Sequence, residues 1–208
     1  FANLRKFVVY LLSCNLSEIL IVGVAAAGGA VLPALPLQIL FLNMVTDVFP
    51  ALALGVGEGS DDVMTQRPRP ASEPILTSRH WQRIFGYAII IALTTLVAFS
   101  YAIFALELTT EEAVTIAFLV IAIAQTLHVF NMAEPSKALF HTEVTRNPYV
   151  WLAVAICSGI LAAAVCTPIL SNILGLQPLT VRGWGLVAVA GVFPCIMGLF
   201  LRMIGRRR

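Results

Sequence analysis

The sequence LQILFLNMVTDVFPALAL, from Leu37 to Leu54, is apolar enough to lie in a membrane and yet contains Asn43, Thr46 and Asp47. An ionised carboxylate near the middle of a bilayer costs about 3 kcal/mol on insertion scales, so an acid in this position is by default a functional residue. Asn43 and Asp47 are four residues apart and share one helix face, which Thr46 borders. Pro50 lacks an N–H donor, and we expect it to kink or unwind the helix and to free carbonyl oxygens beside that face.

A second polar pair lies in the preceding apolar stretch, where Asn15 and Glu18 are three residues apart and share one helix face. Glu18 and Asp47 cannot both be ionised and unpaired in hydrocarbon, so a bound cation or a proton must balance their charge. The alternative is a pair of protonated carboxyl groups that serve only helix packing. Carboxylate, amide and hydroxyl oxygens suit Ca²⁺, Mg²⁺ or Mn²⁺. The predicted metal ligands are Asn15, Glu18, Asn43, Thr46 and Asp47.

The composition predicts an all-α membrane protein that crosses the bilayer several times. Of the 208 residues, 59% are hydrophobic and 12% are charged, against about 25% charged in soluble domains, and the mean hydropathy is +0.91. At about 20 residues per crossing, residues 1–208 form one membrane domain with six predicted helices. These are residues 7–30, 37–54, 83–106, 113–133, 149–170 and 183–203, with a proline-rich polar loop over 55–82.

The positive charges predict the orientation. Twelve of the 13 Lys and Arg residues fall on one side of the predicted spans, and Arg182 falls on the other. Cytoplasmic loops are enriched in Lys and Arg, so we expect both termini in the cytoplasm. As a separate expectation, we place the protein in the plasma membrane. These basic residues lie at the ends of the spans rather than on a face that could bind nucleic acid. We therefore expect the lipid bilayer, and not nucleic acid, as a partner.

The fourth predicted span contains Gln125, His128 and Asn131 at steps of three residues. His128 could relay a proton or bind a metal ion together with Asn131. Both residues could equally be polar groups that hydrogen-bond inside the helix bundle. For Gln125 we favour such a packing role.

Several of these strings resemble the C-terminal transmembrane region of P-type cation ATPases, in the branch of the calcium pumps. The strings are NLRKF at 3–7, YLLSCNLSE at 10–18, LNMVTDVFPALALG at 42–55, DVM at 62–64 followed by RPRP at 67–70, and HVFN at 128–131. The resemblance covers essentially the whole chain, and the string at 42–55 is the most specific.

The resemblance implies that the six spans are the fifth to tenth helices of a pump that exports Ca²⁺ or Mn²⁺. Asn15, Glu18, Asn43, Thr46 and Asp47 then match ion-binding positions. Where two-calcium pumps have a glutamate on the eighth helix, this sequence has His128, so we expect one well-formed divalent site. ATP and Mg²⁺ would act only through cytoplasmic domains outside this chain, and the 55–82 loop would contact the phosphorylation domain.

The sequence leaves three functions open. The chain begins with Phe1, and we expect it to be a piece of a longer pump whose first helices and cytoplasmic domains are its partners. The alternative is a self-standing six-helix ion channel or secondary cation transporter, and a third possibility is a membrane scaffold without transport. Oxygen ligands exclude a pump for soft Cu⁺ but leave Mg²⁺, Na⁺ and H⁺ open.

Overall fold

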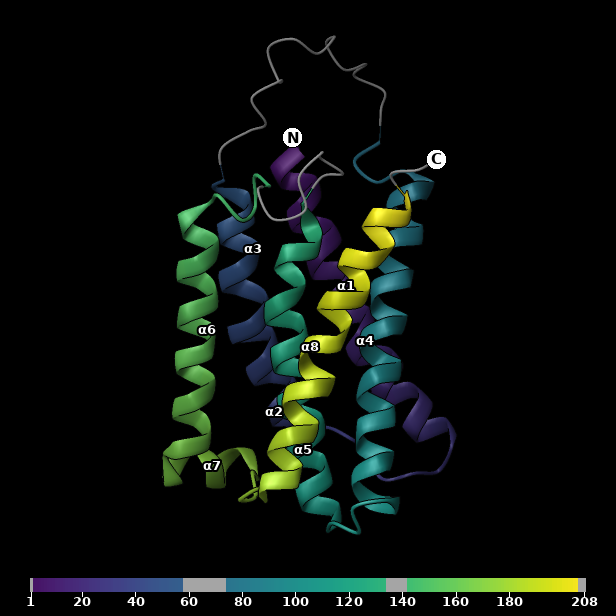
Figure 1. Cartoon of the computed structure of the whole chain (residues 1–208), viewed down its shortest axis with the longest axis vertical. Coiled ribbons are helices and arrows are strands. Elements are labelled where there is room, and N and C mark those ends of the chain that lie inside the picture. Colours follow the sequence, from purple (N-terminus) through teal and green to yellow (C-terminus); the bar gives the residue numbers. More distant parts are fainter. Residues whose placement is uncertain (1, 58–73, 134–141, 206–208) are drawn as a thin grey trace, which may run out of the picture.

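The computed structural model of the chain describes residues 2–57, 74–133 and 142–205, and these residues form helices and no strand. Six helical segments among them are long and apolar enough to cross a membrane, which confirms the predicted fold class. They stand side by side in Figure 1, with both termini at one end of the bundle. The segments are α1 (Ala2–Ala27), Pro36–Gly55, α4 (Ser78–Phe104), Thr110–Met132, α6 (Pro148–Cys166) and Val181–Met203 within α8 (Val181–Gly205).

The second span is not a regular α-helix. It consists of α2 (Pro36–Leu42), a π-helical turn η1 (Asn43–Asp47) and α3 (Val48–Gly55). Pro50 lies inside α3, and a proline ring crowds the carbonyl group four residues earlier, which here belongs to Thr46 in η1. The distortion therefore falls on the polar residues and not on the proline itself.

The helix predicted at 149–170 ends earlier, at Cys166. Thr167 has extended backbone angles (φ −94°, ψ 116°), as expected for a residue that precedes a proline. Pro168 then starts a separate short helix, α7 (Pro168–Leu174), which lies across the bundle at the end away from the termini in Figure 1. This helix stops at Gly175, whose φ of +66° is a left-handed conformation that glycine adopts without strain.

Capping residues extend two other helices beyond the predicted apolar stretches. α4 begins at Ser78 rather than at 83, because Thr77 and His80 cap its first turn with their side chains. α5 (Thr110–His128) begins after Thr109, which accepts a hydrogen bond from the backbone N–H of Glu112. Its far end continues as a 3₁₀ turn, η2 (Val129–Met132). Residues 58–73 of the predicted 55–82 loop lie outside the described part of the chain.

α5 is the central helix and is buried along most of its length. Two apolar clusters pack around it, and the candidate polar residues lie between these clusters along each helix. On α1, Cys14 belongs to one cluster and Ile21 to the other, so Glu18 falls between them. Asp47 likewise falls between Leu42 and Ala51 of the second span. The fold therefore encloses the acidic residues in the middle of the bundle.

The described basic residues follow the predicted charge asymmetry. Those at the end that holds the termini are Arg5, Lys6, Arg79, Arg83, Arg146 and Arg202, while Arg182 starts α8 at the opposite end. The remaining basic residues (Arg67, Arg69, Lys137 and Arg206–Arg208) lie outside the described part of the chain. Which end faces the cytoplasm stays a prediction.

Candidate cation-binding site

Both intramembrane acids point into the bundle and not toward lipid. Glu18 on α1 is 5% exposed, and Asp47 at the end of η1 is 3% exposed. The Asn15 amide (Nδ2) donates a hydrogen bond of 2.9 Å to Asp47 Oδ2, and the Gln125 amide (Nε2) donates one of 2.9 Å to Glu18 Oε1. The sequence prediction that these acids turn inward on neighbouring helices thus agrees with the geometry.

Gln125 connects the three helices at the centre of this site. Its Oε1 accepts a hydrogen bond of 2.8 Å from the Thr46 hydroxyl, while its Nε2 holds Glu18. The same hydroxyl lies 2.9 Å from the carbonyl oxygen of Leu42. The side chain of Asn43 also interacts with the Glu18 carboxyl group. A continuous polar network therefore runs from α1 through α5 to η1.

Side chains from other helices satisfy the backbone carbonyl groups of the irregular second span. Pro50 has no N–H to donate to Thr46, and the Tyr10 hydroxyl donates a hydrogen bond of 2.7 Å to that carbonyl oxygen instead. The Cys157 thiol on α6 donates one of 3.2 Å to the carbonyl oxygen of Val45. The carbonyl oxygens that we expected Pro50 to free are thus already paired.

One carboxylate oxygen in the site receives no hydrogen bond from the described residues. Asp47 Oδ1 is buried and has no hydrogen-bond partner among the described residues. A buried anionic oxygen without a donor is costly, and a bound cation would remove that cost. No three His, Cys, Asp or Glu side chains gather anywhere in residues 2–57, 74–133 or 142–203. A cation here would therefore need amide and hydroxyl oxygens as well, which fits hard cations.

His128 and Asn131 belong to a different environment. Their side chains contact each other at 3.3 Å (Nδ1 to Nδ2), and His128 is enclosed by two tyrosine rings. Tyr10 stacks on its imidazole at 5.8 Å between ring centroids, and Tyr87 meets it edge-on at 4.5 Å. Within the described part of the chain, no hydrogen bond links either residue to Glu18 or Asp47. The structure therefore does not bring these two candidates into the carboxylate network.

The sequence favoured a packing role for Gln125, and Gln125 is hydrogen-bonded inside the bundle to Thr46 and Glu18. Two further residues of the site, Tyr10 and Cys157, gave no signal in the sequence, because an aromatic residue and a thiol in an apolar stretch are usually core residues. Their roles depend on which backbone carbonyl groups the second span leaves unpaired.

The chain is similar to known cation pumps. The family model described as "Cation transporting ATPase, C-terminus" matches residues 31–204. Calcium-transporting ATPase 1 of Bacillus cereus is 32% identical over 98% of this chain and 24% of its own length. The calcium-transporting ATPase of Bacillus subtilis is 32% identical over 95% of this chain and 22% of its own length. P-type sodium-transporting ATPase4 of Plasmodium falciparum is 40% identical over 50% of this chain and 8% of its own length. The chain thus spans about a quarter of the two bacterial relatives.

Proposed function

Because this chain belongs to the family of cation-transporting ATPases, we propose that it forms the ion pathway of an ATP-driven pump that exports a divalent cation, Ca²⁺ or Mn²⁺. The observation that carries the proposal is the buried pair Glu18 and Asp47 on facing helices, with Asp47 Oδ1 lacking any donor among the described residues. ATP and Mg²⁺ act in cytoplasmic domains of the same polypeptide that this chain does not include. The termini face the cytoplasm of a plasma-membrane protein.

The cation would be held between α1 and η1. Asp47 Oδ1 offers an oxygen that no described group uses, and Glu18 supplies the second negative charge. Asn15 bonds to Asp47 and Asn43 interacts with Glu18, and together with Thr46 they would add neutral oxygens once their amide or hydroxyl groups rotate. Gln125 and Asn15 donate to the two carboxylates in the arrangement described above. These donors hold the acids in place, and the cation would displace them.

The ligand set favours a divalent over a monovalent ion. Two carboxylates balance two positive charges in a region of low dielectric, where uncompensated charge is costly. Two of the relatives are calcium-transporting ATPases by name, and one is a sodium-transporting ATPase. Ca²⁺ tolerates six to eight oxygen ligands in irregular geometry. Competition of Mn²⁺ and Na⁺ with Ca²⁺ during uptake measures the preference directly.

The test is ATP-driven uptake of radioactive Ca²⁺ by vesicles that carry the intact pump. Asp47→Asn and Glu18→Gln each remove one of two ligand charges, and we expect each to lower the apparent affinity for Ca²⁺ by roughly tenfold or more. Glu111→Gln is the matched control, because this exposed carboxylate lies in the first turn of α5. Unchanged uptake by both Asp47→Asn and Asn43→Ala would refute the site assignment.

A further inference from the structure

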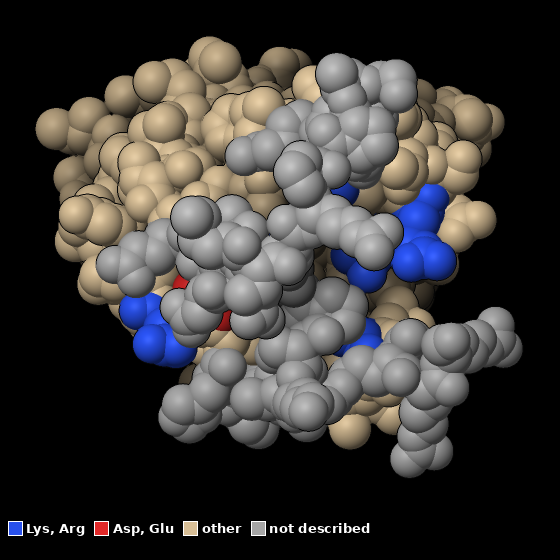
Figure 2. Space-filling view, turned by 90° about the horizontal axis from the view of Figure 1, so that it is seen from above, with Lys and Arg blue, Asp and Glu red and all other residues tan. Residues whose placement is uncertain are grey.

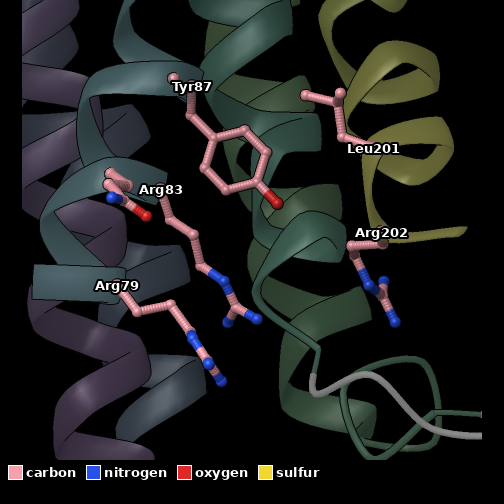
Figure 3. A pocket seen from close by; sticks show the side chains of 7 residues that line it. Arg79, Arg83, Tyr87, Leu201 and Arg202 are labelled. Atoms are coloured by element: carbon pink, nitrogen blue, oxygen red, sulfur yellow. The ribbon is translucent and has the colours of Figure 1, made fainter. Parts of the chain in front are cut away.

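A pocket with a volume of about 250 Å³ lies between the start of α4 and the end of α8, at the end of the bundle that holds the termini (Figure 3). Arg79, Arg83 and Tyr87 line it from α4, and Leu201 and Arg202 line it from α8. In Figure 3 the three guanidinium groups extend in the same direction, away from the aromatic ring of Tyr87 and from Leu201. The pocket therefore has a positively charged mouth and an apolar inner part.

The charges at the mouth are suited to an anion. No described residue forms an ion pair with Arg79 or Arg83, and Arg202 is oriented by a hydrogen bond of 3.2 Å from its Nη1 to the carbonyl oxygen of Phe130. Guanidinium groups present planar pairs of N–H donors that match the oxygens of a phosphate. Three such groups around one small cavity favour a phosphate over a single carboxylate.

The neighbouring surface strengthens the positive field. An adjoining cavity of about 700 Å³ shares Arg79 and Arg83 with the pocket and is also lined by Arg5 of α1, whereas the charge of Lys6 in the same lining is balanced by an ion pair with Glu143 at 2.9 Å. In Figure 2, which looks onto this end of the bundle, a group of Lys and Arg side chains lies on the right, away from the visible acidic atoms. An anion that approaches this part of the surface therefore meets several positive charges.

The exposed residues around the pocket indicate the source of the phosphate. Trp81 lies between the two arginines in the sequence, is 44% exposed, and packs against Phe85 at 6.1 Å between ring centroids. Exposed tryptophans mark the boundary between the hydrocarbon core and the lipid headgroups. Phe200 and Leu201 on α8 and Phe85 on α4 are also exposed and apolar, as expected for residues that face acyl chains. A phosphate bound by these arginines would therefore lie at the level of the headgroups, beside lipid tails.

We propose that the pocket formed by Arg79, Arg83 and Arg202 binds the phosphate of an anionic phospholipid from the leaflet on the side of the termini. The arginines hold the phosphate, Tyr87 offers its hydroxyl group, and Leu201 contacts the glycerol and the start of an acyl chain. A zwitterionic lipid is disfavoured, because its ammonium group would face the same guanidinium groups.

The first test measures which lipids remain bound to the intact purified protein. The protein is reconstituted in phosphatidylcholine containing a minor fraction of phosphatidylglycerol, extracted in detergent, and analysed by native mass spectrometry. A basic residue near an anionic membrane surface contributes about a fivefold factor in binding, so Arg79→Gln with Arg83→Gln should lower retention of phosphatidylglycerol by roughly 25-fold. Arg182→Gln, at the opposite end of α8, should leave retention unchanged.

The single variants Arg79→Gln and Arg83→Gln keep the test valid if the double variant fails to fold, with an expected loss of about fivefold each. The second arm uses glycerol 3-phosphate and inorganic phosphate as soluble competitors, together with Leu201→Gln. We expect that neither competitor displaces the lipid. We also expect that Leu201→Gln weakens retention of the lipid. The proposal would be overturned if phosphatidylcholine were retained as well as phosphatidylglycerol, or if the arginine variants had no effect on retention. It would also be overturned if soluble phosphate displaced the lipid while Leu201→Gln left lipid retention unchanged.

Discussion

The hydroxyl group of Tyr10 on α1 donates a hydrogen bond of 2.7 Å to the carbonyl oxygen of Thr46, four residues before Pro50. The backbone nitrogen of residue 50 would make this bond in a regular α-helix, and proline cannot. The side chain of one helix thus replaces a missing backbone donor in another, immediately beside Asp47. Such a contact fixes the position of η1 relative to α1, and hence the separation of the two acids.

Tyr10→Phe should destabilise the protein because it removes this donor and leaves a buried carbonyl group unpaired. The expected loss is about 1–3 kcal/mol in the free energy of unfolding, measured by thermal or denaturant unfolding in detergent. Tyr149→Phe is the matched control, since Tyr149 is 55% exposed. Adding Pro50→Ala to Tyr10→Phe supplies a backbone N–H and should restore part of the loss. A double variant no more stable than Tyr10→Phe would contradict this explanation.

Gln125→Glu should make the stability of the protein depend on divalent cations. The substitution removes the Nε2 donor that lies 2.9 Å from Glu18 and places a second carboxyl group there. Two carboxylates at this separation cannot both be ionised without a cation. In the presence of a chelator, we expect the free energy of unfolding to fall by about 3–5 kcal/mol. Adding Ca²⁺ should restore most of this loss, and the melting temperature measured with and without Ca²⁺ reports the difference.

The control for that experiment is Gln177→Glu, at an exposed position in the turn before α8. It should melt at the wild-type temperature with and without Ca²⁺. If Gln125→Glu lost the same stability in chelator and in Ca²⁺, Gln125 would not lie beside a cation site.

Gly198→Ala should disturb the environment of Asn131. A Cβ atom at position 198 would overlap the Asn131 side-chain amide, so α8 approaches η2 closely only because residue 198 is glycine. We expect a loss of about 1–3 kcal/mol in the free energy of unfolding. Gly159→Ala on α6 is the matched control, because no atom lies within 4 Å of its added Cβ. There the better helix propensity of alanine should stabilise the protein by about 0.5–1 kcal/mol, and equal effects at both positions would rule out the packing argument.

Cysteine labelling tests the orientation. In a background without the native cysteines, Ser78→Cys at the start of α4 should react with a membrane-impermeant maleimide only after cells are permeabilised. Glu107→Cys, in the turn after α4, should react in intact cells, because three spans separate this turn from each terminus and an odd number of crossings places it on the opposite side. The expectation rests on the excess of Lys and Arg at the end that holds the termini. The reverse labelling pattern would show that the termini are outside.

The sequence predicted the parts of this structure that depend on local chemistry. Apolar stretches of the required length marked the six spans, and the cost of burying a carboxylate identified Glu18 and Asp47. The partners of Gln125 lie 107 and 79 residues away in the chain, so no local pattern could place its amide between Glu18 and Thr46. Pro168 was a visible signal for the end of α6 at Cys166, but the apolar residues that follow it masked the break.

The π-helical turn Asn43–Asp47 contains one residue more than the α-helical turn that it replaces. Restoring regular α-helix there would shift one residue along the axis and turn the adjoining segment by about 100°. Asp47 ends this turn, whereas Glu18 lies on an unbroken helix. A change from this π-helical turn to regular α-helix would therefore rotate Asp47 relative to Glu18 and alter the direction from which a cation reaches the two acids.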